Sequence, residues 1–151
     1  MTLVVLDTGP LGLVTNPRAE GEAARCATWL VGTIGQGHTI GLPEIADYEL
    51  RRELLRADLQ RALTRLDQLK AQASVEYLPL TTDAMLEAAR LWAEARNGGF
   101  QTADNTSLDG DVILAAQAIL ASRKGVDVVV ATVNVGHLER YVPARNWQDI
   151  A

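Results

Sequence analysis

The sequence predicts an α/β fold: a single-domain, three-layer α/β/α sandwich with a central parallel sheet. Two observations predict it. Short apolar runs alternate with longer segments of helical periodicity, and such alternation favours parallel strands joined by crossover helices on both faces. The chain has 151 residues, 48% of them hydrophobic, which is enough for one core and too few for two domains of ordinary size. We therefore expect residues 1–151 to form one domain.

The first part of the chain contains two expected strands with a helix between them. Residues 3–6 (Leu-Val-Val-Leu) indicate a buried strand leading into a turn. Apolar residues recur at helical spacing over residues 20–35, which predicts a helix. A second strand is expected over residues 38–42, and Pro43 suits the first turn of the helix that follows.

A long helical pattern extends from Glu44 to about Ala71. One side of it is charged and the other side is apolar, as expected for a helix that packs on a core. The pattern leaves room for a bend or break near Ala57 and Asp58. The expected core positions of this segment are Leu55, Leu59, Ala62, Leu63, Leu66 and Leu69.

Two further strands are expected at residues 75–78 and 126–131. The second of these is almost entirely apolar, which is typical of a strand covered on both faces. The final residues 145–150 are expected to add a short edge strand.

Two helices are expected between these strands. Capping side chains at residues 81–83 predict a helix that ends at Asn97, and a second helix is expected from about Asp109 to Lys124. Residues 97–108 are polar and glycine-rich, which is typical of a loop that borders a site. The expected apolar stripe of the first helix consists of Met85, Ala89, Trp92 and Ala93.

Composition argues against several classes of protein. Cys26 is the only cysteine, so it cannot form an intramolecular disulfide, and its apolar neighbours indicate a small core residue. No stretch approaches the roughly 18 consecutive apolar residues that span a bilayer, and the first residues do not resemble a leader peptide, so we expect a cytoplasmic protein. The net charge of -5 argues against nucleic-acid binding through a broadly basic surface.

Asp7 and Thr132 are expected at the same rim of the sheet. Asp7 follows the first strand, and Thr132 and Asn134 follow the strand at 126–131. In open parallel sheets, ligands bind beyond the carboxyl ends of the strands, where the strand order reverses. An aspartate directly after apolar residues is costly to desolvate unless it is paired, and a divalent cation is one solution. The alternative for Asp7 is a turn or cap residue.

Other carboxylates lie on the expected helices. Glu44, Glu49 and Glu53 share one helix, where most glutamates are merely solvated. Asp109 and Asp111 open another helix, where the helix dipole favours negative charge. Capping is therefore a sufficient explanation for both aspartates, and it fits Asp109 better.

Four segments resemble the motifs of the PIN-domain family. VVLDTGPLG resembles its first motif, a hydrophobic strand ending in Asp, and YELRREL resembles the helix that carries its Glu-Leu. DVILAAQAIL resembles its Asp-x-x-Ile-Ala-Ala helix, and VVVATVNVGHL resembles its last strand with the Thr-x-Asn or Thr-x-Asp segment. The four occur in order and span nearly the whole chain. The resemblance implies a PIN-like fold and a metal-dependent ribonuclease.

Carried over residue by residue, the resemblance implies that Asp7, Glu49 and Asp111 are catalytic and bind Mg²⁺ or Mn²⁺. Asn134 matches the last motif and is a further candidate ligand, but its amide brings no negative charge. His137 stands where VapC-like members often have Asp, so a second metal should bind more weakly. Two further aspartates lie near Asp111 in the sequence and are secondary candidate ligands: Asp109 and Asp104.

The implied reaction is hydrolysis of an RNA phosphodiester by water activated at one or two hard cations. Thr8 and Thr132 are expected to hydrogen-bond a ligand carboxylate or water, and both are candidate substrate-binding residues. Arg51 and Arg52 follow Glu49 on the same helix and are candidates for contacts with the RNA backbone. The alternative for these arginines is a solvated face with intrahelical ion pairs. His137 lies near Asn134, and a structural role is favoured for it.

Many small PIN domains that the chain resembles are VapC-like toxins of toxin-antitoxin pairs. The resemblance therefore implies a small antitoxin that covers the acidic site, and a homodimer. A second hypothesis is a degenerate PIN module that binds RNA or protein without cleavage, because the fourth carboxylate is missing. A third is a magnesium-dependent phosphatase, but the chain lacks Asp-x-Asp-x-Thr/Val after its first strand.

Overall fold

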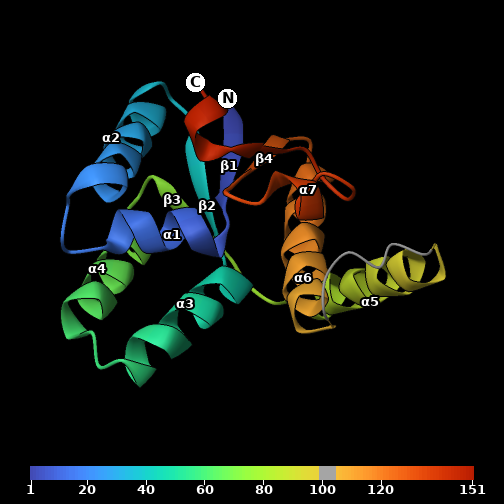
Figure 1. Cartoon of the computed structure of the whole chain (residues 1–151). Helices are drawn as coiled ribbons and strands as arrows, with labels where there is room; N and C mark the ends of the chain where they lie inside the picture. The colour runs from blue at the N-terminus through green and yellow to red at the C-terminus, as the bar shows by residue number, and fades with distance from the viewer. Residues whose placement is uncertain (99–104) are drawn as a thin grey trace.

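The computed structural model describes residues 1–98 and 105–151. Within these residues, five parallel strands form one sheet in the order β3-β2-β1-β4-β5. Helices lie on both faces, so the predicted three-layer α/β/α fold is confirmed (Figure 1). The strands are β1 (Thr2–Leu6), β2 (Thr39–Pro43), β3 (Val75–Leu78), β4 (Asp127–Thr132) and β5 (Ala144–Asn146).

The helices form two groups around the sheet. Figure 1 shows α1, α2 and α4 on one side of the strands and α5 and α6 on the other. Helix α3 contacts both α1 and α6, so it joins the two groups. The helices are α1 (Thr8–Thr15), α2 (Gly21–Gly35), α3 (Glu44–Arg56), α4 (Gln60–Lys70), α5 (Thr82–Asn97), α6 (Asn105–Ser122), α7 (Val135–Leu138) and the 3₁₀ helix η1 (Trp147–Asp149).

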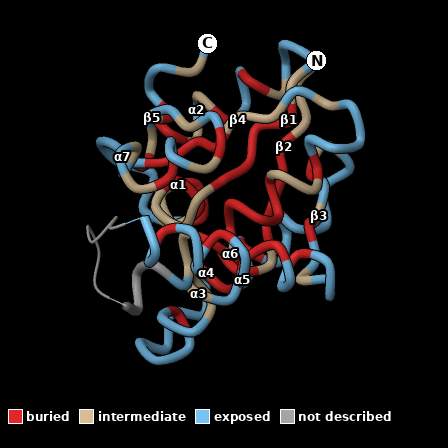
Figure 2. Tube along the Cα trace, turned by 90° about the vertical axis from the view of Figure 1, so that its right-hand side faces the viewer, coloured by how far each residue is buried: buried red, intermediate tan, exposed pale blue. Residues whose placement is uncertain are grey.

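The core is centred on β1, the middle strand of the sheet. Its residues from Leu3 to Leu6 are buried, and Figure 2 shows buried residues concentrated on the central strands and on the inward sides of the helices. A strand with helices over both faces must be apolar along its whole length, which explains the unbroken Leu-Val-Val-Leu run. No helix of the described residues is both long enough and apolar enough to cross a membrane.

The long helical pattern from Glu44 is broken near Ala57 and Asp58, where the sequence left room for a bend or break. Helix α3 ends at Arg56 and α4 begins at Gln60, and Asp58 between them has a φ of 55°. The break turns the chain, so two of the six predicted core positions are wrong: Leu55 and Leu59 are exposed. Leu54 is buried instead, together with the four predicted positions in α4.

Helix α1 contradicts the turn that was expected after the first strand. Asp7 is its N-cap, and its side chain accepts the N–H of Thr8. Pro10 is the third residue of the helix, within the first turn, where backbone N–H groups have no intrahelical partner. A proline there removes no helical hydrogen bond, so the local breakers Gly9 and Pro10 do not prevent the helix.

The helices before β4 differ from their predictions in register. In α5 the buried residues are Ala84, Ala88, Leu91 and Ala95, with Glu87, so the predicted stripe of Met85, Ala89, Trp92 and Ala93 is wrong by one position. Helix α6 begins four residues earlier than predicted, at Asn105. The predicted loop at residues 97–108 is correspondingly shorter, and its central residues lie outside the described part of the chain.

Candidate active site

The candidate site lies where β1 and β4 end side by side. Leu6 pairs with Ala131, and the N–H of Asp7 donates to the carbonyl of Ala131 at 3.0 Å. From β1, the chain continues to β2 and β3 on one side, and β4 and β5 lie on the other. The strand order therefore reverses between β1 and β4, as the ligand-site rule requires, and Asp7 and Thr132 meet at this rim as predicted.

Thr132 holds the carboxylate of Asp7. Its hydroxyl donates to Oδ2 of Asp7 at 2.7 Å and accepts the N–H of Asn134 at 2.9 Å. The side chain of Thr132 is fully buried. The predicted hydrogen bond from Thr132 to a candidate ligand carboxylate is therefore present, and the enclosed hydroxyl acts on Asp7 and does not face the solvent from which a substrate would approach. Oδ1 of Asp7 accepts the N–H of Thr8 at 2.8 Å, so Asp7 caps α1 and faces the rim at the same time.

Glu49 reaches this rim from α3. Its Oε1 accepts the hydroxyl of Thr8 at 3.1 Å. Its Oε2 lies against the backbone of Gly110, where a Cβ atom would come within 2.8 Å of that oxygen. Gly110 thus makes room for Glu49 beside the first part of α6. The sequence analysis missed this residue, although a glycine between two aspartates inside a helix was an available signal.

Asp111 completes a group of three carboxylates. Burial raises the pKa of Asp111, the negative charges of Asp7 and Glu49 add to this effect and His137 opposes it, and together they bring the pKa to about 6. Nδ1 of His137 lies 3.5 Å from Oδ2 of Asp111. Three carboxylates from β1, α3 and α6, far apart in the sequence, therefore act on one another at the rim.

The PIN domain matches the chain over residues 4–134 in a comparison with protein families. This chain belongs to the PIN domain family. PIN domains are nuclease domains, and the matched range contains Asp7, Glu49 and Asp111. A search among curated proteins found no match.

Solved structures of VapBC complexes share the fold of this PIN domain. One, from Rickettsia felis and bound to a promoter DNA fragment, is 15% identical with a TM-score of 0.71, covering 97% of this chain and 99% of that one. DNA-bound VapBC from Salmonella typhimurium is 21% identical with a TM-score of 0.68, covering 97% and 99%. VapBC-1 from nontypeable Haemophilus influenzae is 15% identical with a TM-score of 0.64, covering 98% and 100%.

The donors of this PIN domain fit a hard cation by their chemistry. Asp7, Glu49 and Asp111 offer carboxylate oxygens, which Mg²⁺ and Mn²⁺ prefer, and a cation among them would offset the like charges that raise the pKa of Asp111. As the side chains stand, no group of three or more His, Cys, Asp or Glu residues in the described ranges is arranged to hold a metal ion. The hydroxyls of Thr8 and Thr132 occupy carboxylate oxygens of Glu49 and Asp7 instead.

Asn134 and His137 lie together at the edge of this group. Asn134 is the N-cap of α7, and its Nδ2 is 3.2 Å from Nδ1 of His137 in the first turn. His137 thereby reaches Asp111. The imidazole lies at the rim beside Asn134, where the sequence analysis placed it.

Asp109 does not lie with the other candidate ligands. It lines a cavity of about 400 Å³ between α5 and α6, with Met85 and Trp92 among the other lining residues. Asp109 and Asp111 are two residues apart on one helix and therefore project in nearly opposite directions. Asp109 is also the fifth residue of α6, so the structure does not bring it to the other candidate ligands, and its predicted capping role is contradicted. Asp104 lies outside the described residues.

The two candidate arginines of α3 have different surroundings. Arg51 bonds Asp47 through Nε and Asp67 through Nη2, both at 2.8 Å, so it faces α4. Its position two residues after Glu49 places it on the opposite side of α3, so the structure does not bring Arg51 to the rim and its ion pairs match the alternative given for it. The guanidinium of Arg52 lies 5.1 Å from the ring centre of Tyr48, and Arg52 is three residues after Glu49, on its side of the helix.

Other polar residues singled out by the sequence have structural contacts. Oε1 of Glu44 accepts the N–H of Leu80 at 2.6 Å, and Glu53 pairs with Arg56. Cys26 is fully buried, which confirms the predicted core residue, and burial raises the pKa of its thiol to about 12. Among the three glutamates of α3, Glu49 is therefore the one that reaches the rim.

Proposed function

We propose that this PIN domain is an endoribonuclease that depends on Mg²⁺ or Mn²⁺ and acts in the cytoplasm as the toxin of a VapBC-like pair. The carrying observation is the gathering of Asp7, Glu49 and Asp111 at one rim, where burial together with the charges of Asp7 and Glu49 raises the pKa of Asp111 to about 6. Converging carboxylates at a topological switch point are suited to a hard cation. Membership of the PIN family, matched over residues 4–134, supports the proposal.

In this proposal Asp7, Glu49 and Asp111 hold the cation, and the amide oxygen of Asn134 is a further candidate donor. When bound, the cation activates a water for attack on the RNA phosphodiester and offsets the charge that develops on phosphate. Thr132 orients Asp7 by its 2.7 Å hydrogen bond. Thr8 orients Glu49 in the same way.

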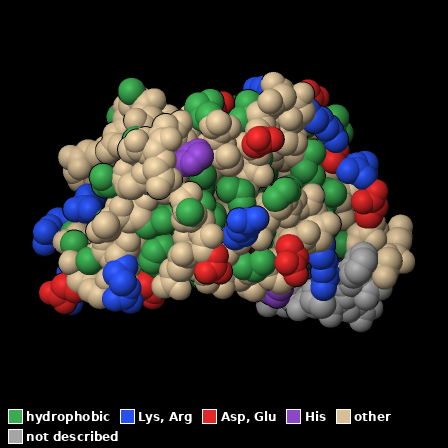
Figure 3. All heavy atoms as spheres, turned by 90° about the horizontal axis from the view of Figure 1, so that it is seen from above, with side chains coloured by type: hydrophobic (Ala, Val, Ile, Leu, Met, Phe, Trp, Pro, Cys, Tyr) green, Lys and Arg blue, Asp and Glu red, His purple; other side chains and the backbone are tan. Residues whose placement is uncertain are grey.

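The substrate in this proposal approaches over the exposed rim. Arg52 is the candidate phosphate contact, since Arg51 is engaged by Asp47 and Asp67. The net charge of the chain is -5, and the face seen from above in Figure 3, away from the rim, carries acidic and basic side chains interspersed. A few local contacts, rather than a broadly basic surface, would then bind RNA, which predicts a weak dependence of affinity on salt concentration.

The proposed partners are an antitoxin protein and a second copy of this chain. The support is the likeness in fold to VapBC structures along 97% or more of the chain. Expression of the chain alone should arrest growth of a bacterial host, and the product of an adjacent open reading frame should relieve the arrest. Light scattering of the purified protein should give twice the 16.3 kDa mass of one chain.

The test of the activity is cleavage of single-stranded RNA with Mn²⁺ or Mg²⁺. We expect cleavage that EDTA abolishes and that Asp7→Asn and Asp111→Asn remove while the circular dichroism spectrum is retained. Glu53→Gln is the matched control, because Glu53 lies on α3 and pairs with Arg56 away from the site. Cleavage that persists in both aspartate variants would overturn the proposed site.

A second candidate function is a PIN module that binds RNA or protein without cleaving it. The observation that favours it is His137 beside Asp111, where VapC-like proteins often carry an aspartate. Manganese titration of the wild-type protein and of His137→Asp separates the two functions. Cleavage by the wild type supports the nuclease, whereas absence of cleavage in both proteins on several RNAs favours the binding module.

A further inference from the structure

Helix α3, which carries Glu49, begins without a side-chain cap of its own. Its N-cap residue is Pro43, which makes no side-chain hydrogen bond to the first turn. The first N–H groups of a helix have no intrahelical partners, and an N-cap oxygen normally accepts one from the second or third residue. Ile45 is the second residue of α3 and is buried, so another part of the protein must supply the acceptor.

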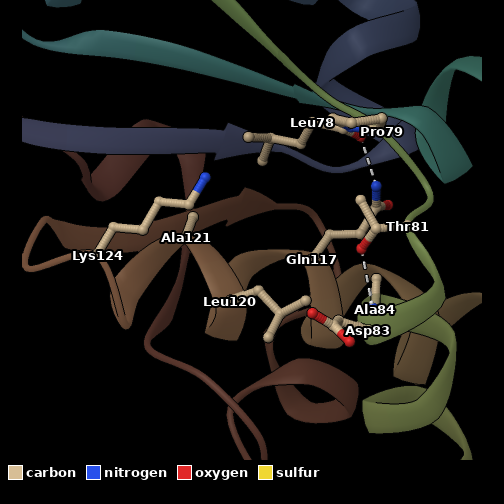
Figure 4. A pocket seen from close by; sticks show the side chains of 9 residues that line it. All are labelled: Leu78, Pro79, Thr81, Asp83, Ala84, Gln117, Leu120, Ala121 and Lys124. Atoms are coloured by element: carbon tan, nitrogen blue, oxygen red, sulfur yellow. Dashed lines mark hydrogen bonds between the residues drawn. The ribbon is translucent and has the colours of Figure 1, made fainter.

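Gln117 of α6 supplies that acceptor. Its Oε1 accepts the N–H of Ile45 at 3.4 Å, and its Nε2 donates to the carbonyl of Leu78, the last residue of β3. The side chain is almost completely buried, with 3% of the residue exposed. Figure 4 shows Gln117 pointing from α6 toward Leu78 and Pro79, with the hydrogen bond to Leu78 drawn. One amide therefore connects α6, α3 and β3.

This connection lies on the same helix faces as the candidate site. Ile45 and Glu49 are four residues apart on α3, and Gly110 and Gln117 are seven apart on α6, so each pair shares one face of its helix. Glu49 packs against Gly110, and the N–H of Ile45 bonds Gln117. The two helices thus meet at two places along one interface, by packing at Gly110 and by a buried hydrogen bond at Gln117.

We propose that Gln117 is a positioning residue: it caps α3 from α6 and thereby fixes Glu49 relative to Asp111. Apolar packing alone is non-directional, whereas a hydrogen bond sets a distance and a direction between the two helices. The inference rests on the proposed function, because its consequence is the affinity of the three carboxylates for a cation. Residues that orient ligands without touching the ion commonly affect metal affinity about 10- to 100-fold.

The first test compares Gln117→Met with Thr81→Ala. Methionine keeps the size of the side chain and removes both hydrogen bonds. Thr81 is a matched control: it lines the same cavity of about 300 Å³ as Gln117, and its hydroxyl caps α5, a helix without a candidate ligand. We expect both variants to melt a few degrees below the wild type. Only Gln117→Met should weaken Mn²⁺ binding, by about tenfold, as measured by electron paramagnetic resonance of free Mn²⁺.

Two further measurements separate the cap from the metal site. Gln117→Glu keeps the oxygen that accepts from Ile45, so its Mn²⁺ affinity should stay within about threefold of the wild type even if the protein is less stable. Hydrogen exchange should show faster exchange of the Ile45 amide in Gln117→Met and no change in Gln117→Glu.

The outcomes bear on distinct claims. Unchanged Mn²⁺ affinity in Gln117→Met with a lowered melting temperature would reduce Gln117 to a structural residue and overturn the positioning role. Unchanged exchange at Ile45 would overturn the cap without reference to any metal. No Mn²⁺ binding by the wild-type protein would overturn the proposed function, and with it the role of Gln117 toward the cation.

Discussion

Two of the carboxylates of helix α3, Asp47 and Glu49, are two residues apart and have opposite electrostatic surroundings. Asp47 is buried and bonds Arg51 at 2.8 Å, and Lys70 lies 3.8 Å away. Glu49 shares the rim with Asp7 and Asp111, and its negative charge helps to raise the pKa of Asp111. The ion pairs around Asp47 connect α3 to α4, whereas the candidate site gathers charges of one sign. Asp47, whose charge is balanced by cations, has a structural role, whereas the unbalanced negative charges around Glu49 mark the candidate site.

The largest expected effect comes from breaking the balanced cluster. Asp47→Asn removes the charge that offsets Arg51 and Lys70 while nearly preserving shape. Asp47 is buried, but Arg51 and Lys70 are 30% and 42% exposed, and Arg51 keeps its pair with Asp67. Solvent therefore screens part of the loss, and the free energy of unfolding should fall by about 2 kcal/mol in urea denaturation, the scale of a lost charged hydrogen bond. The folded Asp47→Asn protein should bind Mn²⁺ with the affinity of the wild type. A loss below about 0.5 kcal/mol, the size of an exposed pair, would show that the cluster does not stabilise the fold.

A glycine substitution tests the other side of the comparison. In Gly110→Ala the new Cβ would lie 2.8 Å from Oε2 of Glu49, so the end of this flexible side chain must move. Alanine also favours a helix over glycine by up to about 1 kcal/mol. We expect unchanged or higher stability together with Mn²⁺ binding about tenfold weaker, measured by titration calorimetry. Wild-type affinity in this variant would place Glu49 outside the metal site.

Removing a charge from the candidate site should raise the free energy of unfolding, whereas Asp47→Asn should lower it. Burial and the charges of Asp7 and Glu49 raise the pKa of Asp111 from 3.8 to about 6, so its ionised form destabilises the folded protein at pH 7. With metal removed by EDTA, Asp111→Asn should therefore increase the free energy of unfolding by about 1 kcal/mol. Equal or lower stability of the variant would contradict a carboxylate cluster under mutual repulsion.

The increase in the free energy of unfolding caused by Asp111→Asn should also depend on pH. Below 3.8 the Asp111 carboxyl is protonated in both the folded and unfolded wild-type protein, so it carries no penalty. As the pH rises toward about 6, the unfolded state releases its proton first, and the wild type loses stability relative to the variant. The difference between the two proteins should appear over this window and stay constant above it. A difference that grows as the pH falls would have the wrong sign.

The sequence predicted the sheet and its rim better than the helices. Apolar runs marked the strands, and the rule for parallel sheets brought Asp7 and Thr132 together. The stripe of α5 was misplaced because Met85 and Trp92 are more apolar than Ala84 and Ala88, which face the core. Hydrophobicity alone cannot identify the inward face when small residues allow close helix packing.

The candidate ligands were less predictable from residue patterns than the rim. Glu44, Glu49 and Glu53 share one helix, and only the resemblance to PIN domains selected Glu49. In the structure, the space that the Glu49 carboxylate occupies at the rim depends on Gly110, which is 61 positions away in the sequence. Asp109 was misassigned because proximity in sequence to Asp111 was taken as proximity in space. On a helix, a separation of two residues points side chains apart.

The smallest effect on stability is expected for an exposed ion pair of α3, which shows that the comparison above applies to buried charges. Arg56 and Glu53 on α3 form a pair at 2.9 Å, like Arg51 and Asp47, but their side chains are 72% and 58% exposed. Solvent and salt screen such a pair, so its contribution is below about 0.5 kcal/mol. Arg56→Ala should therefore leave urea denaturation almost unchanged, and added salt should not alter that result. A loss comparable to Asp47→Asn would mean that position on α3, rather than burial, determines what an ion pair contributes.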